Sequence, residues 1–245
     1  MPYLVFDIET AAIPFDSLAD SQQEFLLRGA EGEDQIAERK RQMSLNPLTA
    51  QVAAIGMLYA EDITTTEPKT MIFSSSATPS NIGQLPDGSI WRCMPEAEVL
   101  QAWWQRFEKS ADRGINIVTF NGRSFDCPFL MLRSGLLRVR PSRNLMAGTR
   151  WNHESHIDLQ AELAFKEFDK TGPSRRWNFD FYCKAFGITS PKEEGITGND
   201  VARLFAAGQH QAIAEYCMRD VHATWELFKV WKEFMQGIPS LTGRG

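Results

Sequence analysis

The chain has 245 residues, of which 43% are hydrophobic, and a formal net charge of −5 at pH 7. This length fits one sizeable core, and no apolar run approaches the roughly 18 to 20 residues that a membrane helix needs. The acidic balance argues against a passive nucleic-acid coat protein, which is usually basic. It does not exclude an enzyme whose clustered carboxylates hold cations.

The start of the chain and the cysteines indicate a reducing compartment. Residues 1–7 lack the basic start and the cleavage-like site of a secretory signal. The cysteines are too far apart for a CxxC pair and have no histidine at zinc-finger spacing. They are Cys93, Cys127, Cys183 and Cys217. We therefore expect buried free thiols, a cytoplasmic location and no membrane partner.

The first third of the chain predicts strands separated by an insertion. Residues 3–9 are typical of a buried strand, and 52–59 and 70–73 of the next two strands. Residues 14–50 are charged and Gln-rich, so we expect a helical insertion there with a solvated face. Residues 74–87 are rich in Ser, Pro and Gly, which indicates a loop.

The remaining two thirds predict mostly helices. Pro95 opens a helix to about residue 111, in which apolar residues recur at four-residue spacing. A strand over 115–120 ends at Asn121-Gly122, and Asp126-Cys127-Pro128 begins the next helix. Further helices are expected at 158–168, 177–186, 199–207 and 210–235. Strands with interleaved helices predict a single α/β domain over residues 1–245, built on a mixed sheet.

Asp7 and Glu9 form the first candidate metal-binding pair. Side chains alternate along a strand, so both project from the face that also carries Tyr3 and Val5. Two adjacent carboxylates resist burial unless a cation lies between them, and oxygen ligands favour Mg²⁺ or Mn²⁺. An Asp-x-Glu at a strand end is also common on ordinary polar surfaces, so this pair alone is weak evidence.

Asp126 follows the Asn-Gly turn, just before Pro128. An Asp at the start of a helix is more often an N-cap than a metal ligand, although one residue can serve as both.

Tyr216 and Asp220 are four residues apart in the last predicted helix, so they lie on one helical face. That face adjoins an apolar stripe made of Ile213, Cys217, Val221, Phe228 and Trp231. Asp220 therefore lies at the margin of the buried side, where an unpaired carboxylate is costly. Either a metal ion or a simple pair with a tyrosine or arginine would relieve that cost.

The three elements occur in a specific order: a strand-end Asp-x-Glu, then Asn-Gly-x-x-Phe-Asp, then Tyr-x-x-x-Asp in a late helix. This order resembles the DEDD superfamily of 3′→5′ exonucleases in its tyrosine-bearing branch. It is most similar to stand-alone bacterial exonucleases related to the proofreading domain of family B DNA polymerases. The histidine-bearing branch has His five residues before the last Asp, where this chain has Glu215. The resemblance implies a ribonuclease H-like fold, with a five-stranded mixed sheet flanked by helices and an antiparallel second strand.

The resemblance also implies the chemistry. Asp7, Glu9, Asp126 and Asp220 would hold two divalent cations, Mg²⁺ or Mn²⁺, in a two-metal-ion mechanism. Tyr216 would orient the attacking water, since a phenol with a pKa of about 10 is a poor base at neutral pH. The implied activity is hydrolysis of phosphodiester bonds at the 3′ end of single-stranded nucleic acid, with DNA favoured over RNA.

Several further residues are candidates for substrate contact. Asn121 and Phe125 flank the site in sequence, and Phe125 could stack on a base or belong to the core. The densest basic stretch would either track the nucleic-acid backbone or remain solvated. It consists of Arg133, Arg138, Arg140, Arg143 and Arg150. Lys192 is either a phosphate contact or a solvated loop residue, and Asp158 is expected to be a helix cap.

Three other functions remain open at this point. A catalytically weak or inactive homologue that binds nucleic acid is disfavoured by the complete set of four carboxylates and Tyr216. A metal-dependent phosphatase or nucleotide hydrolase is possible, but the chain has no GxxxxGK loop of a P-loop enzyme. An endonuclease of the ribonuclease H type is disfavoured by the resemblance alone. Any proofreading would act in trans, and no particular polymerase or repair partner is indicated.

Overall fold

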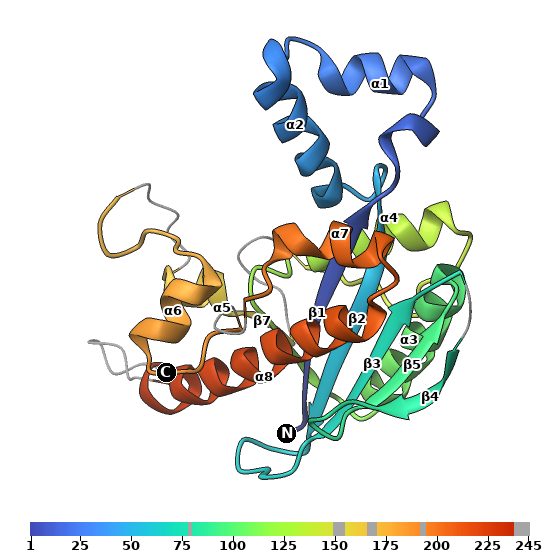
Figure 1. Cartoon of the computed structure of the whole chain (residues 1–245). Helices are drawn as coiled ribbons and strands as arrows, with labels where there is room; N and C mark the ends of the chain where they lie inside the picture. Colours follow the sequence, from blue (N-terminus) through green and yellow to red (C-terminus); the bar gives the residue numbers. More distant parts are fainter. Residues whose placement is uncertain (78–79, 149–154, 166–170, 192–194, 238–245) are drawn as a thin grey trace.

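The computed structural model describes residues 1–77, 80–148, 155–165, 171–191 and 195–237 (Figure 1). Arg150 and Lys192 lie outside the described residues. In the ranges that are described, no helix is long and apolar enough to cross a membrane. All four cysteines are free and buried, as the sequence predicted.

A seven-stranded mixed sheet forms the centre of the molecule, in the order β4-β5-β3-β2-β1-β6-β7. Its strands are β1 (Tyr3–Ala12), β2 (Ala50–Ala60), β3 (Lys69–Ser75), β4 (Ser80–Gln84), β5 (Ile90–Met94), β6 (Asn116–Thr119) and β7 (His156–Asp158). β1 lies between antiparallel β2 and parallel β6. The α/β class, the ribonuclease H-like arrangement and the antiparallel second strand are therefore as predicted.

The predicted number of five strands is wrong. β4 lies within residues 74–87, which we expected to be a loop, and it pairs with β5 to form an antiparallel ribbon. β5 extends the sheet by pairing in parallel with β3, and Trp91 Nε1 donates a hydrogen bond to Ser74 Oγ across that pair (3.0 Å). Strand formation here depends on a partner elsewhere in the chain, which local composition does not show.

Helices cover both faces of the sheet. α3 (Glu96–Ala111) and α4 (Asp126–Leu136) lie on one face, and α8 (His210–Phe234) crosses the other. The smaller helices are α5 (Leu159–Leu163), α6 (Phe179–Ala185), η4 (Gly198–Asp200) and α7 (Val201–Ala206). The helices expected from the sequence are thus present, with ends shifted by a few residues.

The alternation of β1 divides the core into two layers. Tyr3 and Val5 face α8, where the Tyr3 and Phe228 ring centroids are 4.8 Å apart. Leu4, Phe6 and Ile8 face α3 and α4, where the centroids of Phe6 and Trp103 are 5.4 Å apart. The predicted faces of this strand are confirmed, and Asp7 and Glu9 belong to the layer beneath α8.

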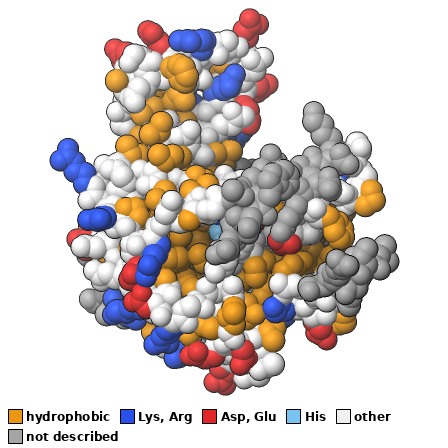
Figure 2. All heavy atoms as spheres, turned by 180° about the vertical axis from the view of Figure 1, so that it is seen from behind, with side chains coloured by type: hydrophobic (Ala, Val, Ile, Leu, Met, Phe, Trp, Pro, Cys, Tyr) orange, Lys and Arg blue, Asp and Glu red, His pale blue; other side chains and the backbone are white. Residues whose placement is uncertain are grey.

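The segment between β1 and β2 projects from one end of the sheet (Figures 1 and 2). It consists of η1 (Phe15–Ser17), α1 (Asp20–Leu27), α2 (Gly32–Gln42) and η2 (Met43–Leu45). Among the residues described, neither α1 nor α2 contains a buried one. Figure 2 shows apolar side chains at the neck of this projection and charged ones at its outer end. The segment is therefore attached through its base, where Leu18 and Met43 are buried.

Candidate active site

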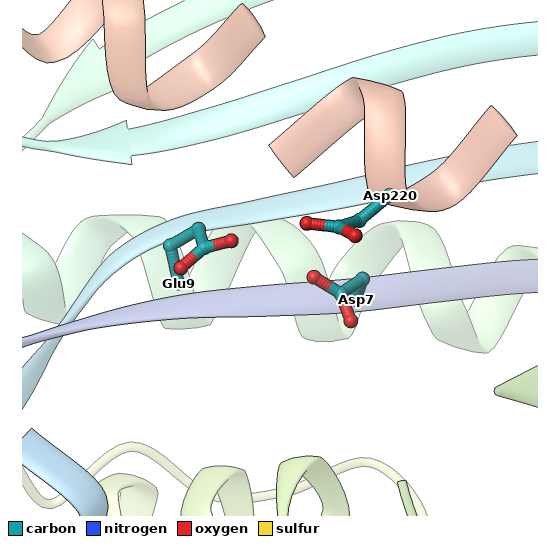
Figure 3. A group of neighbouring side chains, drawn as sticks. All are labelled: Asp7, Glu9 and Asp220. Carbon is teal, nitrogen blue, oxygen red and sulfur yellow. The ribbon is translucent and has the colours of Figure 1, made fainter. Parts of the chain in front are cut away.

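Three carboxylates meet between β1 and α8 (Figure 3). Asp7 and Glu9 extend from β1, Asp220 comes from α8, and one oxygen of each lies within 4.8 Å of the others. Glu9 is buried, and Asp7 and Asp220 are partly buried. The structure therefore brings three of the four predicted carboxylates into one compact group, although Asp220 is more than 200 residues from the others in sequence.

An irregularity in the sheet coincides with Glu9. Glu9 pairs with Ala54 in the β1–β2 ladder, but Thr10 pairs with Val52, so that Ala53 is an extra residue. Bulges of this kind bend a strand and change the direction of nearby side chains. The bulge thus lies directly beside the residue that brings the second carboxylate of β1 into the site.

Asp126 is buried at the first turn of α4 and approaches β1 from another direction. Its Oδ1 accepts a hydrogen bond from the backbone N–H of Ile8 (3.0 Å), between Asp7 and Glu9. β6 pairs with residues 3–5 of β1, so Ile8 lies beyond that pairing and Asp126 satisfies its N–H instead. The N-cap of α4 is Phe125, and the interpretation of Asp126 as a helix cap is wrong.

The carboxylates perturb one another strongly. Burial raises the pKa of Asp7 well above its usual value, and the charges of Asp126, Asp220 and Glu9 raise it further. Burial and the charges of Asp220 and Asp126 also raise the pKa of Glu9, and burial raises the pKa of Asp126 to about 7. A bound cation would relieve this repulsion and favour the ionised forms. An all-oxygen donor set within mutual reach fits a hard divalent cation such as Mg²⁺ or Mn²⁺.

Tyr216 lies one helical turn before Asp220 and is buried. Burial raises the pKa of its phenol well above the usual value, and the charges of Asp220, Glu9 and Asp7 add to that effect. The phenol therefore stays protonated at neutral pH, where it can donate a hydrogen bond but cannot serve as a base.

Asp158 fixes the turn that leads to Asp126. It caps α5 by accepting a hydrogen bond from the Gln160 N–H (3.2 Å), which confirms the cap predicted from the sequence. Its two carboxylate oxygens also accept the N–H groups of Asn121 (2.8 Å) and Arg123 (3.0 Å). Sequence reasoning missed this second role because the donors are 37 and 35 residues away.

The Asn-Gly turn depends on its residue types. Asn121 has a φ of 63°, in the left-handed region that asparagine tolerates better than most residues. A Cβ on Gly122 would collide with the Thr119 side chain. The turn signal in the sequence therefore corresponds to a tight bend that Asp158 holds.

Residues 70–240 match a protein family described as a predicted 3′–5′ exonuclease related to the exonuclease domain of PolB. The chain belongs to this family. The matched range contains Asp126, Tyr216 and Asp220 and begins after Asp7 and Glu9, which the geometry alone adds to the site. As a member of a 3′–5′ exonuclease family, the chain has nucleic acid as its implied substrate class.

Among solved structures, the chain is similar to the family B DNA polymerase from the hyperthermophilic archaeon Pyrobaculum calidifontis. The two are 15% identical with a TM-score of 0.53, over 96% of this chain and 24% of the polymerase chain. The chain thus spans about a quarter of the polymerase's length, and the likeness shows a shared fold. A comparison with curated proteins found no match.

The expected phosphate-tracking arginines of this PolB-related exonuclease are partly engaged elsewhere. Arg133 is turned inward and makes a bidentate ion pair with Glu96 (2.7 Å for each contact). Arg143 pairs with Glu108 and Asp112 at the surface (2.9 Å each). The predicted contact with the nucleic-acid backbone is therefore wrong for Arg133, because its charge is already neutralised in a largely buried ion pair. Arg138 and Arg140 are exposed.

The two candidate substrate residues differ in their surroundings. Phe125 packs against the core layer beneath α3 and α4, with its ring centroid 5.7 Å from that of Phe129. Asn121 is partly exposed at the turn beside Asp126. Core packing thus buries part of the Phe125 side chain. The contact of Phe125 with a base stays a prediction.

Proposed function

We propose that this PolB-related exonuclease belongs to the tyrosine-bearing DEDD branch and removes nucleotides from the 3′ end of single-stranded nucleic acid, with DNA favoured over RNA. The observation that carries the proposal is the convergence of Asp7, Glu9 and Asp220 within 4.8 Å. Tyr216 stands one helical turn away from Asp220, where the tyrosine-bearing branch requires it.

The four carboxylates would bind two cations. Asp7 adjoins Ile8, whose N–H binds Asp126, and it also belongs to the cluster with Glu9 and Asp220. We assign Asp7, Glu9 and Asp220 to one divalent cation, and Asp126 with Asp7 to a second. When bound, Mg²⁺ or Mn²⁺ would make a water molecule acidic enough to attack at neutral pH and would stabilise the charge of the leaving oxygen.

The protein side chains would orient the attacking water and the terminal nucleotide. Tyr216 remains a protonated phenol and would hold the attacking water in line with the phosphorus by a hydrogen bond. Asn121 and Phe125, at the bend before Asp126, would contact the terminal nucleotide. These roles need a rigid turn, which the hydrogen bonds from Asn121 and Arg123 to Asp158 provide.

The test is digestion of 5′-labelled single-stranded DNA and RNA of matched sequence with Mg²⁺ or Mn²⁺. We expect a ladder that shortens from the 3′ end, is lost with EDTA and is lost in Asp7→Asn. The matched control is Glu226→Gln, which alters an exposed carboxylate on α8 that pairs with Lys229. If neither nucleic acid is cut while calorimetry shows bound Mn²⁺, the exonuclease proposal is wrong, and the chain is either an inactive homologue that binds nucleic acid or an enzyme for a different phosphate ester.

A further inference from the structure

An exposed stack of planar side chains stands at the start of α6, outside the carboxylate cluster. The rings of Trp177 and Phe181 are nearly parallel, with centroids 4.3 Å apart and an angle of 15° between the planes. The guanidinium carbon of Arg175 lies 4.3 Å from the Trp177 ring centroid. Phe181 is 51% exposed, so a large part of its ring surface is available to a ligand.

The exposure of Phe181 is not needed to build α6. Tyr182 and Cys183 supply the buried side of this helix, and Trp177 packs partly against the same core layer as α8. Asn178 caps the helix by accepting the N–H of Phe181 (2.9 Å), which fixes the position of that residue. The rest of the Phe181 ring faces solvent, where a polar side chain is usual on a surface helix.

The charges near the stack favour an anionic ligand. Asp180 is the nearest carboxylate in sequence, and it already pairs with Lys184 (3.1 Å) and accepts a hydrogen bond from Ser190 (2.5 Å). The guanidinium of Arg175 adds a permanent positive charge to the aromatic pair. An aromatic face beside an arginine matches a nucleobase linked to a phosphate.

The stack is joined to the candidate active site through packed side chains. Phe120, which immediately precedes Asn121, contacts Phe179 and Tyr182 of α6 with centroid distances of 4.7 and 5.7 Å. Gln160 donates a hydrogen bond from Nε2 to the Trp177 carbonyl (3.2 Å), next to the Asp158 cap. The elements that position Asn121 therefore also position the stack.

We propose that Arg175, Trp177 and Phe181 form a second subsite for single-stranded nucleic acid, which binds a nucleotide on the 5′ side of the one being removed. An unpaired base stacks on Phe181, and a phosphate farther along the same strand lies near Arg175. The proposal rests on the proposed exonuclease function for the position of the 3′ end. Stacking on an aromatic ring tolerates any base, which suits an enzyme that degrades a strand regardless of sequence.

The test measures binding without cleavage. Fluorescence anisotropy with 5′-fluorescein oligothymidylates in EDTA compares a trimer with a 15-mer. We expect Phe181→Ala to weaken binding of the 15-mer about tenfold, and to weaken the trimer far less. Phe181→Trp should restore the affinity, since it keeps a stacking face. The control is Phe25→Ala, which removes another exposed ring (65%), on α1 in the projecting segment.

Three outcomes would overturn the subsite. One is a Phe181→Ala protein that melts like the parent and binds the 15-mer as tightly as Phe25→Ala does. Another is an equal loss for trimer and 15-mer. The third is a change in oligomeric state with unchanged DNA affinity, which would assign the stack to a contact between copies of the chain. Stack-dependent binding without any cleavage would instead support the subsite and contradict the exonuclease activity.

Discussion

Gly56 lies directly opposite Asp7 in the β1–β2 ladder, and a Cβ on Gly56 would be 2.9 Å from Cγ2 of Val221 on α8. The same Cβ would be 3.1 Å from Cys217 Sγ and from Met218 Sδ. Cys217 in turn donates a weak hydrogen bond from Sγ to the Asp7 carbonyl (3.5 Å). The absence of a side chain at position 56 thus lets α8 lie against the sheet beside Asp7, and this close approach sets the distance between Asp7 and Asp220.

Gly56→Ala should separate α8 from β1 and disturb the proposed metal site. We expect a loss of about 10²-fold in kcat/KM, as for a catalytic group displaced by about 1 Å, and a stability loss of about 1–3 kcal/mol from overpacking. Exonuclease kinetics and urea denaturation check both values. Gly83→Ala in β4 is the control, because its Cβ would meet Trp91 at an ordinary 3.7 Å. Full activity in Gly56→Ala would show that the helix position does not matter.

The stability of the metal-free protein should fall as pH rises. The folded-state pKa of Asp126 is raised to about 7, above its unfolded value of about 3.9, so the native state binds more protons between these values. The protonated form therefore favours the native state, and this contribution declines as pH rises through about 7. Urea denaturation in EDTA at pH 6 and pH 8 should show lower stability at pH 8.

Asp126→Asn is the control for this pH effect. An amide does not titrate, so the difference between pH 6 and pH 8 should shrink in the variant. Mg²⁺ should also reduce the difference in the parent protein, because a bound cation favours the ionised carboxylates. A parent protein that is more stable at pH 8 than at pH 6 in EDTA would contradict the prediction.

Asp158→Asn should loosen the turn before Asp126. The amide keeps one acceptor oxygen but places an NH₂ group near a backbone N–H, so we expect a stability loss of about 1–3 kcal/mol. The KM for a long oligonucleotide should rise, while Mn²⁺ affinity at Asp7, Glu9 and Asp220 should be retained.

Asp200→Asn serves as the matched control for Asp158→Asn. Asp200 also accepts a backbone N–H, from Thr197 (3.0 Å), but within a local turn. Equal effects of the two substitutions on KM would show that Asp158 acts only as a helix cap and does not position the turn for the substrate.

Tyr216→Phe should lower kcat more than it raises KM. The ring stays in the core while the hydroxyl that we propose orients the water is lost, and removing one such hydrogen bond costs about 10²-fold in kcat. Single-turnover cleavage and oligonucleotide binding, measured side by side, separate the two effects. A defect confined to binding would place the hydroxyl on the substrate rather than on the water.

The sequence by itself determined the periodic features of this protein. Strand alternation predicted that Asp7 and Glu9 share the face of Tyr3 and Val5, and helical spacing predicted that Tyr216 lies above Asp220 at the margin of an apolar stripe. Such patterns are readable because backbone geometry fixes them locally.

The tertiary structure decided what depends on contacts between distant residues. Asp126 accepts the Ile8 N–H across 118 residues, and Arg133 is neutralised by Glu96 across 37. β5 became a strand because the edge of β3 was open to it. In each case the fold brings an unsatisfied donor, a charge or an open strand edge close to its partner. The local sequence does not indicate that partner, because the two residues are far apart in the chain.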